Sequence, residues 1–409
     1  MTCKGVRICG KKSETLMVSQ PNRIYRKTLD ETNPIVPCLH IIRLTPQVMK
    51  VIAPVHIMCI NLNTRIITTR NKCAACFKQF VKMEHLVEHM RTSYHSVHEP
   101  TCRICKKHCR SFESLREHLI GPLPKEECKR IFRNQGCKFC LVILNNPDAL
   151  RLHQEICQLP SVNTGVLAQL ANLSIFDNLT IDNVQIRGPQ VVALACKMVG
   201  GGGSDGSLDL CARVCLSDEY ESIIFHTYVK PPTPATNYRY QTTVIRAEYL
   251  REALPLSQAQ RKIQDILYNR EPMRKLRPTD GKASILVGHI LDRDLSLLQI
   301  SYPATMMRDT AKYPPLMQTN KLSNSLKYLA KTYLGYDIQA GSEDPYEDCV
   351  ASMRLYKRMR SQVHKKGDHP QNQNNFALWR QSELEKMTPE QLLEISRPDF
   401  YCWCLDSQG

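Results

Sequence analysis

The strongest constraint on this chain is a cysteine and histidine spacing that occurs three times. The three copies start at Cys73, Cys102 and Cys137, and each reads Cys-x2-Cys-x12-His. A cysteine hairpin that faces a histidine-bearing helix offers tetrahedral sulfur and nitrogen ligands to Zn²⁺. The metal then replaces a core that so short a segment cannot build. We therefore expect residues 71–160 to form three small ββα zinc fingers.

The three units differ in their fourth ligand. His95 completes the first with a His-x5-His spacing, and Cys157 completes the third. The second has no histidine at the usual distance, so Cys128, which follows the histidine after nine intervening residues, is its candidate. The predicted zinc ligands are Cys73, Cys76, His89 and His95; Cys102, Cys105, His118 and Cys128; and Cys137, Cys140, His153 and Cys157. The alternative, unligated cysteines at chance spacings, is disfavoured because one register occurs three times.

The other cysteines do not indicate a disulfide scaffold. The chain holds 19 cysteines, but it begins without a secretory signal pattern and many cysteines fall in Cys-x2-Cys pairs followed by histidine. The most apolar early stretch, residues 51–64, is too short to span a bilayer. We expect a soluble intracellular protein with no membrane partner, and a nuclear, including nucleolar, location.

The charge distribution points to a nucleic-acid partner. Residues 1–160 carry 26 Lys and Arg against 12 Asp and Glu, whereas residues 161–409 carry 29 against 27. The basic half is therefore the half expected to face a polyanion, with RNA favoured over DNA. If finger one docked as a groove reader, Lys82, His85 and Glu88 would face the bases.

Two other readings of the fingers stay open. Irregular linkers and the His-x5-His spacing are similar to matrin-type fingers, which implies recognition of double-stranded RNA by shape and backbone. The other reading is that the fingers bind protein.

The second half of the chain has an α/β pattern. A strand at 191–194 is followed by a glycine-rich turn at 200–203 and by strand-like runs at 208–216 and 222–229, which predict a hairpin meander. A short strand is expected at 285–287. Helices are expected at 256–268, 322–333, 345–359 and 389–395. The glycine-rich turn lacks the Lys-Ser/Thr ending of a phosphate loop.

Residues 187–361 resemble the DEDDh 3′ to 5′ exonucleases of the RNA exonuclease 4 type, and the fingers ahead of them look similar to a plant branch of that family. The motifs that carry the resemblance are Val191-Val192-Ala193-Leu194-x-Cys196-x-Met198-Val199-Gly200, Asn237-Tyr238-Arg239, Leu286-Val287-Gly288-His289-x4-Asp294-Leu295, Arg308-Asp309-Thr310, Ser325-Leu326-x2-Leu329 and Asp348-x4-Met353-Arg354-Leu355-Tyr356. The resemblance implies a ribonuclease H-like α/β domain that cuts RNA or DNA with two Mg²⁺ or Mn²⁺ ions.

Three of the five catalytic positions that the resemblance implies are altered. Asp294 and Asp348 are present, but Ala195 and Lys197 stand where the family has an Asp and a Glu, and Glu343 stands where it has the general-base His. Lys197 brings an ammonium among the remaining carboxylates, and Ala195 removes the ligand shared by both ions. We therefore predict little or no hydrolysis, with Mg²⁺ or Mn²⁺ relevant only if the site works.

Three alternatives to that loss remain. Glu343 could act as a base, Asp292 or Asp205 could replace a missing ligand, or the substitutions could be deliberate inactivation of an active parent. The basic run at 357–360, with Lys365 and Lys366, is either an import patch, a backbone contact or a solvated helix end.

The expected organisation is an N-terminal region at 1–70 of unknown role, fingers at 71–160, a linker at 161–186, the exonuclease-like domain at 187–361 and a polar tail at 362–409. The leading function is an RNA-binding protein whose exonuclease-type domain has a degraded metal site. The alternatives are an active metal-dependent 3′ to 5′ exoribonuclease and a protein-interaction module.

Overall fold

The computed structural model describes residues 71–162, 190–271, 283–364 and 378–408, apart from positions 123, 204, 270, 320 and 342. The expected N-terminal region, most of the expected linker, Lys365 and Lys366 fall outside the described residues. In the part that is described, no helix has the length and apolar character needed to cross a membrane.

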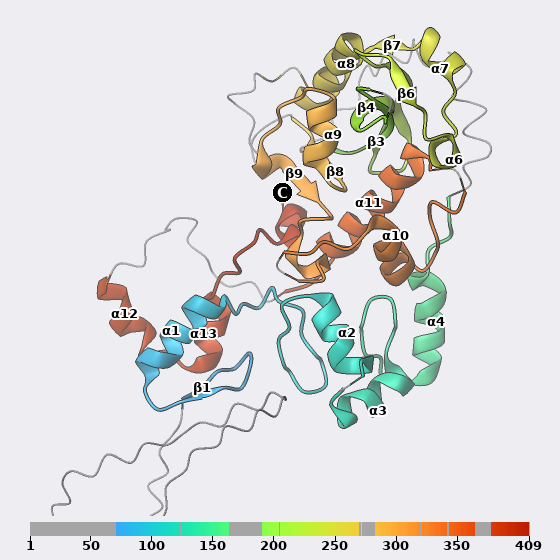
Figure 1. Cartoon of the computed structure of the whole chain (residues 1–409). Coiled ribbons are helices and arrows are strands. Elements are labelled where there is room, and N and C mark those ends of the chain that lie inside the picture. Colours follow the sequence, from blue (N-terminus) through green and yellow to red (C-terminus); the bar gives the residue numbers. More distant parts are fainter. Residues whose placement is uncertain are drawn as a thin grey trace, which may run out of the picture. The chain divides into compact units, whose positions relative to one another are not determined.

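A mixed sheet forms the centre of the α/β part (Figure 1). Strand order is β7-β5-β4-β3-β8-β9, with β6 beside β3. The strands β3, β4 and β5 form the predicted antiparallel meander, while β8 pairs parallel with β3 and β9 pairs parallel with β8. The strands are β3 Val191–Gly201, β4 Leu208–Asp218, β5 Ile223–Lys230, β6 Ala235–Asn237, β7 Leu254–Pro255, β8 Ile285–Gly288 and β9 Met307–Asp309.

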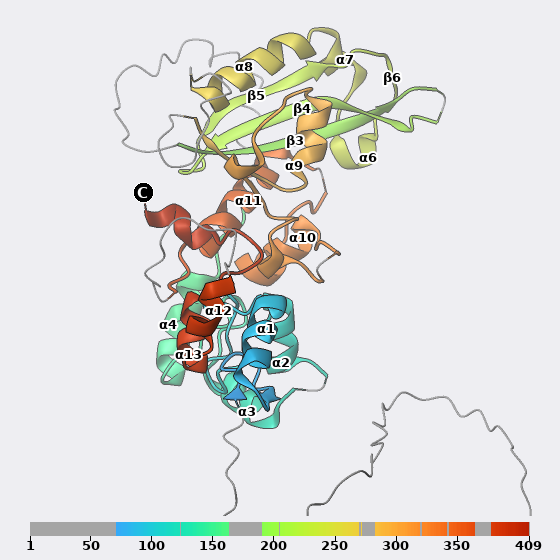
Figure 2. The ribbon, with the colours of Figure 1, turned by 90° about the vertical axis from the view of Figure 1, so that its left-hand side faces the viewer.

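Strand β3 is buried on both faces, and its residues from Val191 to Cys196 alternate between two hydrophobic cores. Val191 and Ala193 pack in a core with helix α11 (Pro345–Arg360). Val192 and Leu194 pack in a second core with α8 (Leu256–Tyr268) and α9 (Leu291–Leu297). Figure 2 shows α8 and α11 on opposite sides of the sheet. This layering of helix, sheet and helix is the predicted α/β class.

The remaining helices of this part are short. They are α6 Tyr240–Thr243, α7 Ala247–Arg251, α10 Leu326–Leu329, 3₁₀ turns at Ala304–Met306 and Pro314–Leu316, and a π-helical turn at Ala330–Leu334.

Most helices match their predicted ranges, but one begins late. The helices predicted at 256–268 and 389–395 have those bounds, and the one predicted at 345–359 is one residue longer. The helix predicted at 322–333 is wrong at its start. Leu322 pairs with Thr319 in an isolated bridge, and the Ser325 hydroxyl caps α10 by accepting a bond from the Tyr328 amide at 3.2 Å.

Of the three units predicted as ββα fingers, only the first has that pattern in full. Finger one is a ββα unit made of β1 (Asn71–Lys72), β2 (Gln79–Phe80) and α1 (Met83–Ser93). Fingers two and three replace the hairpin by single bridges and carry α2 (Phe112–Ile120) and α4 (Pro147–Cys157). Finger two departs from the ββα pattern because it adds a helix, α3 (Glu126–Gln135).

Finger two packs directly on the α/β part. The Glu113 carboxylate on α2 accepts hydrogen bonds from the Tyr328 hydroxyl at 2.8 Å and the Tyr333 hydroxyl at 2.6 Å. The ring of Phe112 meets Tyr333 edge-on, and both residues belong to the core that contains α11. This face of α2 is therefore used for internal packing.

Residues 378–408 lie in the expected polar tail, and they return to both parts of the molecule. They form α12 (Leu378–Leu384), α13 (Pro389–Ile395) and a 3₁₀ turn at Trp403–Gln408. Leu392 and Leu393 of α13 share a core with α1 of finger one. Trp403 stacks on Tyr313 of the α/β part, with ring centroids 3.9 Å apart.

A buried ion pair fixes the end of this segment. The Asp406 carboxylate accepts two hydrogen bonds of 2.7 Å from Arg308, and it also accepts bonds from the hydroxyls of Tyr356 and Tyr401. Both side chains of the pair are almost fully buried, with exposures of 3% and 2%.

We predict that Asp406→Asn lowers the free energy of unfolding by about 3 kcal/mol, because it leaves the Arg308 charge buried without a counter-charge. Urea unfolding of the full chain measures this change. The matched control is Asp292→Asn, which breaks an exposed pair with Lys312 and should cost less than about 0.5 kcal/mol. Equal losses in the two variants would contradict a buried pair.

Candidate functional site

A cleft of about 310 Å³ lies where β3, α6, α9 and α11 meet. It contains all five positions at which the sequence predicted catalytic or altered catalytic residues. Its lining includes Ala195, Lys197, Asp294, Glu343 and Asp348. The sequence motifs, although far apart in the chain, therefore meet in one place.

Lys197 lies between the two acids at the α11 side of the cleft. Its ammonium Nζ is 2.6 Å from Asp348 Oδ2 and 3.3 Å from Glu343 Oε2. Burial lowers the pKa of Lys197, but the two carboxylates outweigh it and raise the pKa above its ordinary value. The lysine is thus a fixed positive charge at the acid cluster.

Asp294 lies deeper, on α9. Its Oδ2 accepts a hydrogen bond of 3.2 Å from the backbone amide of Cys196. Burial raises the pKa of this carboxyl to about 7. Asp309 positions the helix, since its carboxylate accepts from the amides of Ile290 and Leu291 at the start of α9.

The close approach of α9 to β3 depends on Gly288. A Cβ at this position would come within 2.9 Å of the Leu194 carbonyl oxygen and nearer still to Leu291. The glycine of the Leu-Val-Gly-His motif therefore lets the turn before α9 lie directly against β3.

Other cleft residues were not singled out by sequence reasoning. Gln339 donates to Asp348 Oδ1 at 2.9 Å, so both oxygens of that carboxylate are engaged. Arg239 and Arg293 line the cleft and both pair with Asp209. Arg239 lies in a quoted motif, but Gln339 comes from a loop without a sequence signal.

Two proposed substitute ligands lie elsewhere. Asp292 pairs with Lys312 on the surface, and Asp205 accepts from the Ser207 amide in the turn between β3 and β4. Neither residue is among the described residues that line the cleft. The glycine-rich segment forms the predicted hairpin turn, because β3 and β4 pair up to Gly201 and Leu208.

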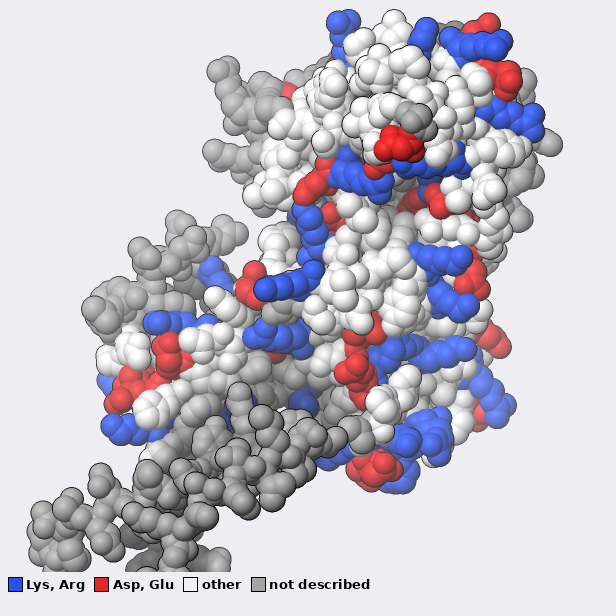
Figure 3. Space-filling model, in the orientation of Figure 1, with Lys and Arg blue, Asp and Glu red and all other residues white. Residues whose placement is uncertain are grey.

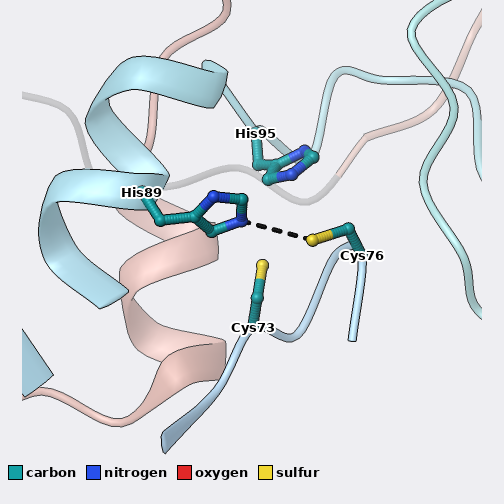
Figure 4. Close-up of side chains that lie close together, drawn as sticks. All are labelled: Cys73, Cys76, His89 and His95. Carbon is teal, nitrogen blue, oxygen red and sulfur yellow. Dashed lines mark hydrogen bonds between the residues drawn. The ribbon is translucent and has the colours of Figure 1, made fainter. Parts of the chain in front are cut away.

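The twelve predicted zinc ligands form three groups, one in each finger. Within each group the four ligand atoms lie within 4.8 Å of one another, and the groups have the composition that the sequence predicted, including Cys128 in the second. Figure 4 shows finger one, where Cys73, Cys76, His89 and His95 point toward a common centre. These donor sets suit tetrahedral Zn²⁺.

Neighbouring side chains orient the histidines of finger one. His95 Nδ1 lies 3.0 Å from the buried Glu99 carboxylate, and His89 Nδ1 lies 3.0 Å from the Ser93 hydroxyl. A partner on Nδ1 leaves Nε2 of each ring for the metal. Burial, with the nearby His95 and Lys78 charges, lowers the pKa of His89 to about 4, which keeps the ring neutral as a metal ligand must be.

The three base-facing candidates in finger one, Lys82, His85 and Glu88, are solvent exposed. Lys82 is the N-cap residue of α1 and His85 lies in its first turn, and neither belongs to the core that α1 shares with α13. Figure 3 shows Lys and Arg side chains over both the finger part and the α/β part, with acidic side chains between them.

The basic run at the end of α11 makes internal contacts instead. Arg358 donates to the Cys157 carbonyl at 2.6 Å, and Lys357 donates to the Glu219 carbonyl at 2.9 Å. These side chains hold α11 to finger three and to the β4–β5 turn, so a free import patch is not formed by them.

Known proteins similar to this chain are exonucleases. No family model matches the chain. RNA exonuclease 4 of Homo sapiens is 31% identical over 211 residues, which are 51% of this chain and 44% of that protein. RNA exonuclease 4 of Candida glabrata is 35% identical over 170 residues, 41% of this chain and 58% of that protein. The chain thus spans about half the length of the curated relatives it matches.

Solved structures give only a distant likeness. The Saccharomyces cerevisiae apo Pan2 pseudoubiquitin hydrolase-RNA exonuclease module in complex with A7 RNA is 24% identical and covers 44% of this chain and 30% of that chain. Its TM-score of 0.37 is too low for an inference about this chain. The relatives in sequence support the exonuclease family that the motifs indicated.

We predict that Asp294 makes stability fall as pH rises from about 4 to about 7. Its folded-state pKa lies above its ordinary value of 3.8, so the folded state holds the proton across this window and the unfolded state does not. Urea unfolding at pH 5 to 8 should show the free energy of unfolding of Asp294→Asn rising relative to that of the wild type up to pH 7. The rise should be at most about 1.4 kcal/mol per pH unit. A difference that is flat with pH would contradict a buried protonated carboxyl.

Metal removal should affect the fingers before the α/β part. The apolar core of finger three consists of a few residues around Cys137, Phe139 and Cys157. The α/β part has the large core of α8 and α9, and it supplies most of the core of α11, which it shares with finger two. After chelation, limited proteolysis should cut first within residues 71–160 and leave a fragment that contains β3 to α11. Equal protection of the fingers with and without chelator would show that zinc does not hold them.

Proposed function

We propose that this chain is a zinc-finger RNA-binding protein whose exonuclease-type domain does not trim RNA efficiently. The observation that carries the proposal is the contact of 2.6 Å between Lys197 Nζ and Asp348 Oδ2. It supports the proposal because the ammonium occupies the space between the acids that the resemblance assigns to divalent ions. A cation site that already holds a lysine charge gains little from a metal.

The residue at position 195 also disfavours metal binding. Ala195 presents a methyl group where the resemblance implies the carboxylate that both ions share, and Glu343 stands in place of the general-base histidine. The remaining charges in the group, Asp294, Asp348, Glu343 and Lys197, include one carboxyl whose pKa is raised to about 7. At neutral pH the cluster therefore carries less negative charge than a two-metal site needs.

Support for RNA as the ligand comes from the basic fingers and from the names of the relatives. We assign the initial contact to finger one, because Lys82 and His85 are exposed while the equivalent helix of finger two packs on Tyr333. Phosphate contacts of this kind give affinity that falls with salt. A nuclear site of action is part of the same proposal.

The first test is a trimming assay with 5′-labelled RNA that has a free 3′ end. The zinc-loaded wild type should leave the RNA intact in Mn²⁺ while shifting it on a native gel. The triple variant Ala195→Asp, Lys197→Glu, Glu343→His should produce a Mn²⁺-dependent ladder. A matched control adds Asp348→Asn to the triple variant and should abolish the ladder.

A ladder from the wild type that disappears in EDTA would overturn the loss of activity and favour a working exoribonuclease. Absence of both a ladder and a gel shift in the wild type would favour a protein-interaction module. Failure of the triple variant alone would mean that the cleft has diverged at further positions.

The contribution of finger one is tested by salt dependence. Removing one phosphate contact with Lys82→Ala should reduce the slope of log affinity against log salt by about 0.7 to 0.9. The control is Lys331→Ala, which removes an exposed lysine of the α/β part that pairs with Asp337. Equal slopes for Lys82→Ala and the wild type would remove finger one from the RNA interface.

A further inference from the structure

A fourth group of cysteine and histidine side chains lies outside the three fingers. It consists of His98, His364, Cys402 and Cys404, whose ligand atoms all lie within 4.8 Å of one another. None of the four belongs to a Cys-x2-Cys-x12-His repeat. His98 lies between fingers one and two, His364 follows α11, and the two cysteines lie near the C-terminal end of the described chain.

The distances in this group match those of a tetrahedral metal site. Cys404 Sγ is 3.4 Å from His98 Nδ1, and Cys402 Sγ is 3.6 Å from His364 Nε2. In a tetrahedral zinc site, bond lengths of about 2.3 Å to sulfur and 2.0 Å to nitrogen place neighbouring ligand atoms about 3.5 Å apart. The corresponding sulfur-to-nitrogen distances in the fingers are 3.1 to 3.3 Å. The fourth group is therefore as compact as a bound zinc ion would require.

The two cysteines are held in place by packing that is independent of a metal. Both are buried, with exposures of 2% and 7%. Trp403 between them stacks on Tyr313, and Asp406 two residues further on makes the buried pair with Arg308. The chain between and after the thiols is thus fixed, which lowers the entropic cost of assembling the site.

The composition of the group also favours zinc. Two cysteines and two histidines form the same donor set as finger one. Two thiolates would neutralise the charge of Zn²⁺, which favours metal binding at this buried position. Binding would form four metal–ligand bonds and release the two thiol protons to solvent. A disulfide between the cysteines would leave the positions of the two histidines unexplained.

We propose that His98, His364, Cys402 and Cys404 bind a fourth zinc ion. This ion would connect the C-terminal segment to the segment between fingers one and two and to the end of α11. The three segments are far apart in sequence, so a metal that joins them would close long loops and restrict the unfolded chain. The site would also hold α13, which packs on finger one, in a fixed relation to the α/β part. The position of finger one relative to the α/β part would then depend on two zinc ions, its own and the one in the fourth group.

The test is the zinc content of the full chain, purified without added metal and measured by atomic emission against protein concentration. Cys402→Ser with Cys404→Ser should contain one zinc fewer per chain than the wild type. The pair His98→Ala with His364→Ala, which changes different segments, should lose the same single zinc. The matched control is Cys211→Ala, a buried cysteine of β4 outside every group, and it should keep the wild-type content.

A wild-type content that persists in both paired variants would overturn the proposal. So would an equal loss in the Cys211→Ala control, because the loss would then reflect unfolding. If the serine pair loses more than one zinc per chain, the zinc content of the histidine pair tests the proposal, which requires that it lose one. Cys137→Ser combined with the serine pair should lose two, since finger three and the fourth site bind separate ions. RNA binding and trimming do not enter this measurement, so its failure leaves the proposed function untouched.

Discussion

Strand β3 imposes the main constraint on this molecule, because it is buried on both faces and its residues from Val191 to Cys196 must each suit one of two cores. Val191 and Ala193 face the core of α11, and Val192 and Leu194 face that of α8 and α9. Lys197 continues the first of these faces, where a charge is tolerated only with a partner. Asp348 on α11 supplies that partner, so the packing of the sheet and the electrostatics of the cleft depend on each other.

The same constraint explains how the charges of the cleft are stabilised. A group of buried carboxylates without metal would repel one another, and removing one partner of a buried pair costs several kcal/mol. Here Lys197 provides the positive charge, Gln339 donates to the other oxygen of Asp348, and burial keeps Asp294 protonated up to about pH 7. The carboxylate of Asp348 therefore has protein partners on both oxygens, as the proposed loss of metal binding requires.

Sequence reasoning located much of the site but not how the parts join. The repeated finger spacing and the motif at 191–200 each report a local geometry, and local geometry is what the sequence encodes most directly. The approach of Lys197 to Asp348 could be expected because both positions belong to motifs of one family. The packing of Glu113 on two tyrosines could not, because nothing in the sequence of α2 separates an interface from a solvated face. The helix predicted from residue 322 started too early because apolar periodicity does not reveal the cap at Ser325.

The contacts of the C-terminal segment could not be predicted for a similar reason. Cys402 and Cys404 become candidate metal ligands only because the fold brings them beside His98 and His364. No regular spacing in the sequence links positions so far apart. Trp403 likewise stacks on Tyr313, and Asp406 pairs with Arg308, which lies 98 positions earlier in the chain. Long-range complementarity of this kind becomes visible only when the fold is known.

The central claim is that the lysine replaces metal in the cleft, and Mn²⁺ binding to the zinc-loaded chain tests it most directly. Electron paramagnetic resonance distinguishes free from protein-bound Mn²⁺ without relying on catalysis. The account predicts that wild type and Asp294→Asn bind Mn²⁺ equally weakly, and that Ala195→Asp with Lys197→Glu creates a tight site. Tight Mn²⁺ binding by the wild type that is lost in Asp294→Asn would contradict it.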